Sequence, residues 1–252
     1  MRDYTDTGEF AVDHIQPSKT RVDAYAGASD LDIPDYLDES SEWSIRARAM
    51  VSSKLKFLGR HIKWAGSRVL VMQCESGLLV DGLVRRGCDV AAIDTRPDVL
   101  EFARARSASH GYRADYRHVR PSEGLPFAKE SFDIVLCDHV FDRNWDTSSV
   151  ITATRRMLRQ NGTLMIACMN NTVGARLGVS TSMVRFAPGM PMGIKPRRPV
   201  KPWVLLNDIA DGGFEVRRPG VLTALGRVHR MSSNMTSKVG PTCVWLGSAT
   251  KL

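Results

Sequence analysis

The chain has 252 residues, 43% of them hydrophobic, which is enough apolar material to bury the core of one sizeable domain. No apolar run approaches the roughly 18 residues that a membrane-spanning helix needs, so the sequence predicts no membrane span. The formal net charge is +8, yet residues 1–41 carry ten acidic and three basic side chains, so the positive excess lies in residues 42–252. We expect an acidic, extended arm over 1–41, solvated or docked on a basic surface, followed by one folded domain over 42–252.

Helix and strand patterns alternate along the rest of the chain. The predicted elements are a helix at 43–60, a strand at 68–73, a helix at 77–86, a strand at 89–93, a helix at 98–110, strands at 114–119 and 132–137, a helix at 147–159 that Asn161-Gly162 terminates, a strand at 163–169, a helix at 202–213, and strands near 214–218 and 241–249. This alternation predicts an α/β fold whose parallel sheet is covered on both faces. The last two strands are expected to form an antiparallel hairpin at the edge of the sheet.

The five cysteines lie singly in apolar segments, with no C-x-x-C pair. This pattern predicts reduced core residues, and disfavours disulfides or metal ligation. They are Cys74, Cys88, Cys137, Cys168 and Cys243.

Residues 170–202 interrupt the alternation. They hold five of the twelve prolines and a basic cluster within 188–202. The cations of this cluster are Lys195, Arg197, Arg198 and Lys201. We expect 170–202 to be a lid-like insertion, and 188–202 to contact a partner protein or an anionic membrane, with an ordinary insertion loop as the alternative.

The segment from Arg68 to Asp94 has the frame of a nucleotide-binding strand–turn–helix–strand unit, with an acidic residue about 20 positions after the turn. Glycines are expected in such a turn because the ligand lies against bare backbone. Here Gln73 and Glu75 stand where two glycines are expected, and only Gly77 remains. The frame therefore predicts the fold more strongly than it predicts a bound nucleotide.

With this order of elements, residues 42–252 resemble the class I S-adenosylmethionine (SAM)-dependent methyltransferases, and most closely the ubiquinone-biosynthesis O-methyltransferases. Residues 69–79 read V-L-V-M-Q-C-E-S-G-L-L, where that family has V-L-D-V-G-C-G-G-G-L-L. Residues 132–144 read F-D-I-V-L-C-D-H-V-F-D-R-N, and 158–171 and 213–216 echo later motifs of the family. The resemblance implies a Rossmann-like fold, with a seven-stranded methyltransferase sheet and helices on both faces.

The resemblance also implies where a cofactor would bind. Members hold SAM through an arginine in the N-terminal helix, the first glycine of the turn, the acidic end of the second strand and a methionine at the end of the fourth. On this chain those positions are Ser53, Gln73, Asp94 and Asp138, so that only Asp94, together with Gly77, keeps the family's residue type.

Electrostatics gives an independent reason to expect weak SAM binding. Glu75 would bring a carboxylate near the carboxylate of SAM, and two like charges about 4 Å apart repel by several kcal/mol at an intermediate dielectric. Gln73 adds a side chain where the ligand would lie, and Val71 replaces the usual acidic residue near the SAM ammonium. We therefore expect no bound cofactor, with SAM as the cofactor if the chain is active.

Two residue readings remain open. Asp94 either accepts ribose hydroxyls or caps the helix that follows Arg96-Pro97. The metal-binding pattern of the resembled family falls on His139, Asp142 and Arg143, so a ligating histidine is replaced by a cation; a site built from His139, Asp138 and Asp142 is the weaker alternative. We assign no metal ligand and no catalytic residue from the sequence.

Three functions follow as hypotheses. The first is a methyltransferase-fold protein that has lost SAM binding and serves as an accessory or scaffold subunit of a larger assembly with protein partners. The second is an active SAM-dependent O-methyltransferase acting on a polyprenyl catechol or a related quinone precursor. The third is an RNA-binding methyltransferase-like factor, suggested by the basic body although nucleic acid is the less expected partner. Since the resembled family is mitochondrial in eukaryotes, the expected location is the mitochondrial matrix or inner membrane.

Overall fold

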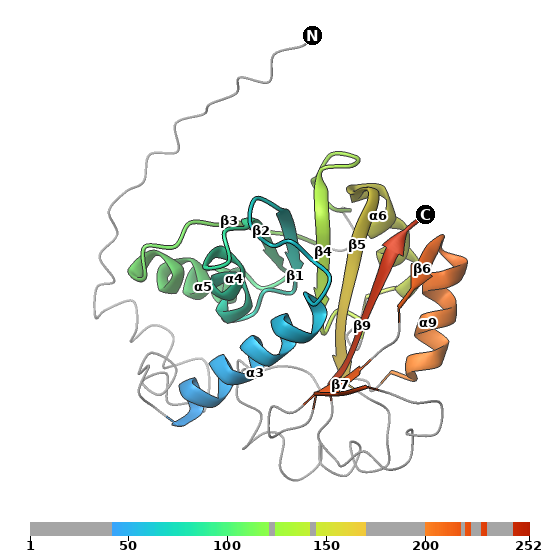
Figure 1. Cartoon of the computed structure of the whole chain (residues 1–252). Helices are drawn as coiled ribbons and strands as arrows, with labels where there is room; N and C mark the ends of the chain where they lie inside the picture. The colour runs from blue at the N-terminus through green and yellow to red at the C-terminus, as the bar shows by residue number, and fades with distance from the viewer. Residues whose placement is uncertain are drawn as a thin grey trace.

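The computed structural model describes residues 42–120, 124–141, 145–169, 200–217, 220–222, 228–230 and 244–252 (Figure 1). The predicted acidic arm at 1–41 lies outside these residues. So do Cys243 and nearly all of the predicted insertion at 170–202, of which only 200–202 is described.

Helices and strands alternate over most of the described chain. In order they are α3 (Glu42–Leu58), β1 (Arg68–Met72), α4 (Leu78–Val84), β2 (Asp89–Asp94), α5 (Pro97–Ser109), β3 (Asp115–His118), β4 (Phe132–Asp138), α6 (Thr147–Met157), β5 (Leu158–Met169), α9 (Pro202–Asp211), β6 (Phe214–Val216), β7 (Gly220–Leu222), β8 (Val228–Arg230) and β9 (Val244–Lys251). Among the described helices, none combines the length and apolar character that crossing a bilayer requires.

The strands form one mixed sheet in the order β3-β2-β1-β4-β5-β9-β7-β8, with β6 also paired to β9. The first five strands are parallel, and β9 runs antiparallel to β5. β6 pairs with residues 249–251 of β9 and β7 with residues 244–246, so these two short strands together fill one position beside β9. Counted this way, the sheet has seven positions and a short additional strand, β8.

Two hydrophobic cores cover the two faces of this sheet, because alternate residues of a strand point to opposite faces. Leu70 and Met72 of β1 belong to one core, which α6 and α9 cover. Val69 and Val71 belong to the other, which α3, α4 and α5 cover. Figure 1 shows the two groups of helices on opposite sides of the sheet.

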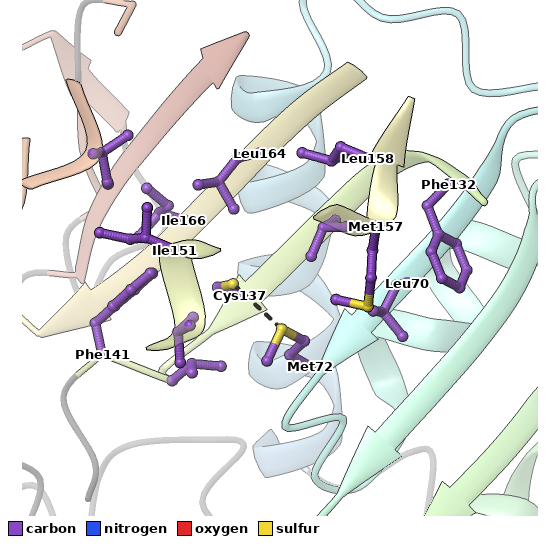
Figure 2. Packing of buried hydrophobic residues seen from close by; sticks show 14 of the residues in the cluster. Leu70, Met72, Phe132, Cys137, Phe141, Ile151, Met157, Leu158, Leu164 and Ile166 are labelled. Carbon is purple, nitrogen blue, oxygen red and sulfur yellow. Dashed lines mark hydrogen bonds between the residues drawn. The ribbon is translucent and has the colours of Figure 1, made fainter. Parts of the chain in front are cut away.

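The core under α6 and α9 is dense and largely aliphatic. Figure 2 shows Ile151 of α6 near Ile166 of β5 and Met157 of α6 near Leu70 of β1, with the Cys137 sulfur 3.7 Å from that of Met72. Burying each such side chain contributes on the order of 1.5–3 kcal/mol. Packing in the two cores holds the strands β1, β2 and β4 in place, and with them the edge of the sheet at which they end.

The predicted α/β fold with a seven-position, Rossmann-like sheet is confirmed, and four cysteines (Cys74, Cys88, Cys137 and Cys168) are free and buried as expected. Two local predictions differ from the structure in detail. Helix α6 ends at Met157, two residues before the predicted end, because the backbone of Leu158 is already extended and pairs with Phe132 of β4. Strand β9 pairs antiparallel with β6, as predicted, but it also pairs with β5 and therefore lies inside the sheet and not at its edge.

Candidate functional site

The parallel strands all end at one edge of the sheet, which we call the carboxyl edge. Ligands of open α/β sheets bind at this edge, beside the point where the strand order reverses. Here the order reverses between β1 and β4, where Met72, the last residue of β1, pairs with Cys137, the last residue but one of β4. The candidate site therefore consists of the turn after β1, the ends of β2 and β4, and the helix α3 that packs nearby.

The turn after β1 keeps a glycine-type backbone with only one glycine. The φ angles are 60° at Gln73, 49° at Glu75 and 78° at Gly77. A left-handed conformation costs a residue other than glycine about 1–2 kcal/mol, so Gln73 and Glu75 are both strained. Gly77 cannot be replaced easily, since an added Cβ would lie 3.0 Å from both the Ala103 Cβ and the Tyr116 hydroxyl.

Hydrogen bonds to β2 hold the turn in this shape. The Cys74 N–H donates to the Ile93 carbonyl at 3.0 Å, and the Glu75 N–H donates to Asp94 Oδ2 at 3.1 Å. The Arg96 N–H donates to the other oxygen, Oδ1, at 3.1 Å. Both oxygens of the Asp94 carboxylate therefore accept backbone N–H groups, and Asp94 is 3% exposed.

These contacts decide one of the two readings of Asp94. The residue that caps α5 is Arg96, with Pro97 as the first helical residue, so the prediction that Asp94 caps this helix is wrong. Instead, the carboxylate accepts hydrogen bonds from Glu75 and Arg96 and so joins the turn after β1 to the start of the β2–α5 connection. Its role toward a ribose stays a prediction.

Gln73 is buried at the start of the turn. The residue is 2% exposed, and its Oε1 finds no hydrogen-bond donor among the described residues. A buried polar atom left without a partner costs about 1–3 kcal/mol. Beside it, Cys74 is buried, and burial, reinforced by the carboxylates of Asp94 and Glu75, raises the pKa of its thiol well above the ordinary value. The thiol stays neutral at physiological pH, so it is a poor nucleophile.

A buried ion pair spans the other side of the site. The Lys54 ammonium of α3 lies 2.6 Å from Asp138 Oδ1 at the end of β4, and the two side chains are only 9% and 11% exposed. His139, also buried, places its Nε2 3.8 Å from the same oxygen. The half-buried Ser53, which the resemblance places at the cofactor, is the neighbour of this lysine. Sequence reasoning missed Lys54, although it stands four residues from Met50 and from Leu58, on the apolar side of α3.

A second set of buried polar side chains lies beside the turn. The Ser107 hydroxyl of α5 donates to Asp81 of α4 and accepts from the Tyr116 hydroxyl at 2.7 Å. Arg106 lies 2.6 Å from the second oxygen of Asp81. Burial raises the pKa of Asp81, and Arg106 and Ser107 oppose the shift. Because Tyr116 and Ala103 contact Gly77, this group fixes the position of the turn; no sequence motif pointed to it.

The structure thus gathers Gln73, Gly77, Asp94 and Asp138 at one edge, as the resemblance implies. Asp142 and Arg143, the other residues of the proposed metal pattern, lie outside the described residues. Within the part of the chain that is described, no three His, Cys, Asp or Glu residues are grouped as metal ligands would be.

Comparison with known proteins shows what this domain is similar to. Residues 70–166 match the family model described as a methyltransferase domain. The ubiquinone biosynthesis O-methyltransferase of Xanthomonas euvesicatoria is 33% identical over 123 residues, and that of Xylella fastidiosa (strain 9a5c) is 29% identical over 122 residues. These matches cover 48% of this chain, and the chain spans about half the length of the curated relatives it matches.

Solved structures share the fold at low sequence identity. The cyclase SpnF superposes with a TM-score of 0.61 at 16% identity, over 85% of each chain. The magnesium protoporphyrin IX methyltransferase of Synechocystis PCC 6803 gives a TM-score of 0.58 at 16% identity, over 83% of this chain and 84% of its own. A SAM-dependent methyltransferase from Thermotoga maritima also gives 0.58 at 16% identity, over 83% and 93%.

Proposed function

We propose that this protein does not use SAM and serves as a non-catalytic accessory subunit of a larger assembly. The premise is that residues 70–166 match a methyltransferase domain and that the chain has the class I fold. The fold alone does not decide activity, since sites are grafted onto folds. One structural neighbour is named a cyclase and others are named methyltransferases. The proposal therefore depends on the residues of the carboxyl edge.

The observation that carries the proposal is the ion pair between Lys54 and Asp138. In the resembled family, the N-terminal helix and the end of the fourth strand contact the cofactor from two sides. In this chain the same two elements contact each other directly, at 2.6 Å and with little exposure. A ligand that lay between them would have to separate the pair, and leaving a buried charge without its partner costs about 3–5 kcal/mol.

The turn supports the same conclusion. Gln73 puts a buried side chain at a position of the turn where the resemblance calls for bare backbone, and both oxygens of Asp94 already bind N–H groups. Glu75 adds negative charge next to where a carboxylate of SAM would lie. The residues present therefore do not fit SAM in the mode that the resemblance implies.

We further propose that the assembly is mitochondrial and that residues 188–202 make the contact with protein partners or with anionic lipid. The location rests on the resemblance to a family that is mitochondrial in eukaryotes. The proposed contact rests on the four cations and on the prolines of the segment. Proline restricts the backbone dihedral angles, so less conformational entropy is lost on binding.

A second candidate is an active SAM-dependent O-methyltransferase acting on a polyprenyl catechol or a related quinone precursor. One observation favours it: the left-handed backbone at residues 73, 75 and 77 is the shape that a glycine-rich cofactor turn adopts. The relatives described above are ubiquinone biosynthesis O-methyltransferases, and they suggest the substrate class.

Calorimetry on the full chain separates the two candidates. We expect neither SAM nor S-adenosylhomocysteine to bind with a Kd below about 100 μM, which corresponds to about −5.5 kcal/mol. The double variant Gln73→Gly/Glu75→Gly should bind better than either single variant, because both side chains obstruct one turn. Binding of SAM by the wild type below that threshold would end the first proposal and support the second.

A further inference from the structure

The opposite edge of the sheet, at which the parallel strands begin, is a continuous surface. We call it the amino edge, made of residues 56–68, 84–89, 110–115, 128–133 and 155–160. Backbone contacts join four of these segments side by side: Gly66 N–H to the Gly87 carbonyl at 2.8 Å, Arg68 N–H to Asp133 Oδ2 at 2.8 Å, and Glu130 N–H to the Arg156 carbonyl at 3.0 Å. The remaining segment, 110–115, leads into β3 beside β2.

Positive charge gathers at this edge. The five segments hold eleven lysines and arginines against four carboxylates. The cations are Lys56, Arg60, Lys63, Arg68, Arg85, Arg86, Arg113, Lys129, Arg155, Arg156 and Arg159, and all except Arg86 are exposed. The anions are Asp89, Asp115, Glu130 and Asp133.

The four carboxylates are already paired with cations. Arg68 lies 3.5 Å from Asp89, Arg117 lies 2.6 Å from Asp115, Arg159 lies 2.6 Å from Asp133, and Lys251 lies 3.5 Å from Glu130. Among the described residues, no carboxylate pairs with Lys56, Lys63, Arg85 or Arg113. The edge thus carries a surplus of exposed cations whose charge is available to an anionic partner.

Aromatic side chains lie among these cations. His110 and Tyr112 stack with ring centroids 5.7 Å apart, next to Arg113. The Arg60 guanidinium lies over the ring of Phe57, 4.0 Å from its centroid, and Trp64 follows Lys63 as a partly exposed side chain. Cations that follow a phosphate backbone, interleaved with rings on which bases stack, are the usual means of binding single-stranded nucleic acid.

We propose that the amino edge binds single-stranded RNA through its phosphate backbone, independently of the carboxyl edge on the other side of the sheet. The row of strand starts from β3 to β5 spans four strand spacings, about 19 Å, which is long enough to follow a single strand over several nucleotides. Membrane binding would need apolar side chains that enter the bilayer. Of the exposed large hydrophobic residues among those described, only Leu252 lies at this edge; Ile45, Trp203 and Val204 lie in the first turns of α3 and α9.

Fluorescence anisotropy with a labelled oligouridylate of about 20 nucleotides tests this proposal, with full-length wild type and the variant Lys63→Glu/Arg85→Glu/Arg113→Glu. We expect the variant to bind at least tenfold more weakly at moderate salt. Losing three phosphate contacts should also reduce the slope of log K against log salt by about 2, since each contact on a single strand contributes about 0.7. The melting temperature should stay the same, because these cations are exposed and make no ion pair with a described carboxylate.

The matched control is Arg104→Glu/Arg120→Glu/Arg217→Glu, which changes the net charge by the same amount at exposed positions outside the amino edge. This control should keep the wild-type affinity. Equal weakening in both variants would show that net charge, not the amino edge, sets the affinity, and would overturn the proposal. Wild-type protein that binds phosphatidylserine vesicles and not the oligonucleotide in low-salt buffer would overturn it as well.

Discussion

Charged side chains are arranged in opposite ways at the two edges of the sheet. At the carboxyl edge the ionisable side chains are buried and satisfied inside the protein: Lys54 by Asp138, and Asp94 by two backbone N–H groups. At the amino edge ten cations are exposed and only four carboxylates oppose them. The edge that binds ligands in other α/β proteins is lined here by buried, paired side chains, while the opposite edge is exposed to solvent and strongly basic. The fold fixes where the edges are, and the side chains set the charge that each edge exposes.

The largest expected effect comes from breaking the buried ion pair between Lys54 and Asp138 at the carboxyl edge. Lys54→Ala should lower the free energy of unfolding by about 3–5 kcal/mol, because it leaves the buried Asp138 without its cation. Urea denaturation measures this loss. Lys56→Ala, in the same helix but exposed, is the control and should change stability by less than about 0.5 kcal/mol. A Lys54→Ala/Asp138→Asn double variant should recover part of the loss; a double variant no more stable than the single one would show that the pair is not the cause.

The next effect concerns the turn. Gly77→Ala should destabilise the fold by about 2–3 kcal/mol, since it adds a left-handed alanine and a Cβ only 3.0 Å from Ala103 and the Tyr116 hydroxyl. Gly66→Ala is the matched control, because Gly66 has nearly the same φ, 79°, with no atom within 4 Å of an added Cβ. The control should cost only about 1 kcal/mol, from the backbone conformation alone. Equal losses in urea denaturation would show that the packing under Gly77 does not matter.

A smaller effect, of opposite sign, is expected at Gln73. Gln73→Met keeps the volume of the side chain and removes the buried Oε1 that has no donor among the described residues. The variant should be more stable by about 1 kcal/mol, seen as a higher urea midpoint with an unchanged slope. Lower stability would mean that a bound water or ion satisfies the Gln73 amide in solution.

The smallest effect depends on pH and on the amino edge. Burial raises the pKa of the Cys88 thiol from 9.0 to about 11, and its sulfur lies 3.3 Å from the Trp64 carbonyl. The unfolded chain therefore loses this proton at a lower pH than the folded chain does. Stability from this group is complete below pH 9 and is lost as pH rises toward 11. Cys88→Ala should flatten the fall in stability over that window, measured by urea denaturation at each pH.

Local sequence patterns predicted most of the fold. Apolar period and glycine stops located the strands and helices from α3 to β4 within a few residues, because these elements depend on neighbours in the chain. The start of β5 was missed because Leu158 pairs with Phe132, a contact that the local pattern does not contain. The antiparallel pairing of β6 with β9 was predicted, but the pairing of β9 with β5 was missed, since β5 lies far away in the sequence.

The candidate site was predicted in part. The motif frame located Gln73, Gly77, Asp94 and Asp138, because these residues follow the ends of strands. It did not reveal Lys54, whose partner is 84 residues away, nor the Ser107–Tyr116 contact beneath the turn. It also could not show that Asp94 binds the backbone of Glu75, since that contact exists only once β1 and β2 lie side by side.

The place of β9 inside the sheet has a consequence for how the chain folds during synthesis. Strands β6 and β7 precede β9 in the chain, yet both pair with it. Until Val244–Lys251 has left the ribosome, β5 has a bare edge and β6 and β7 have no partner on that side. The parallel half of the sheet can form first, but the other half must wait for β9 to insert between strands that were made before it. Such late, long-range pairing is slow and leaves strand edges exposed to other chains, so we expect yield in a cell to depend on the release of β9 more than on any residue of the carboxyl edge.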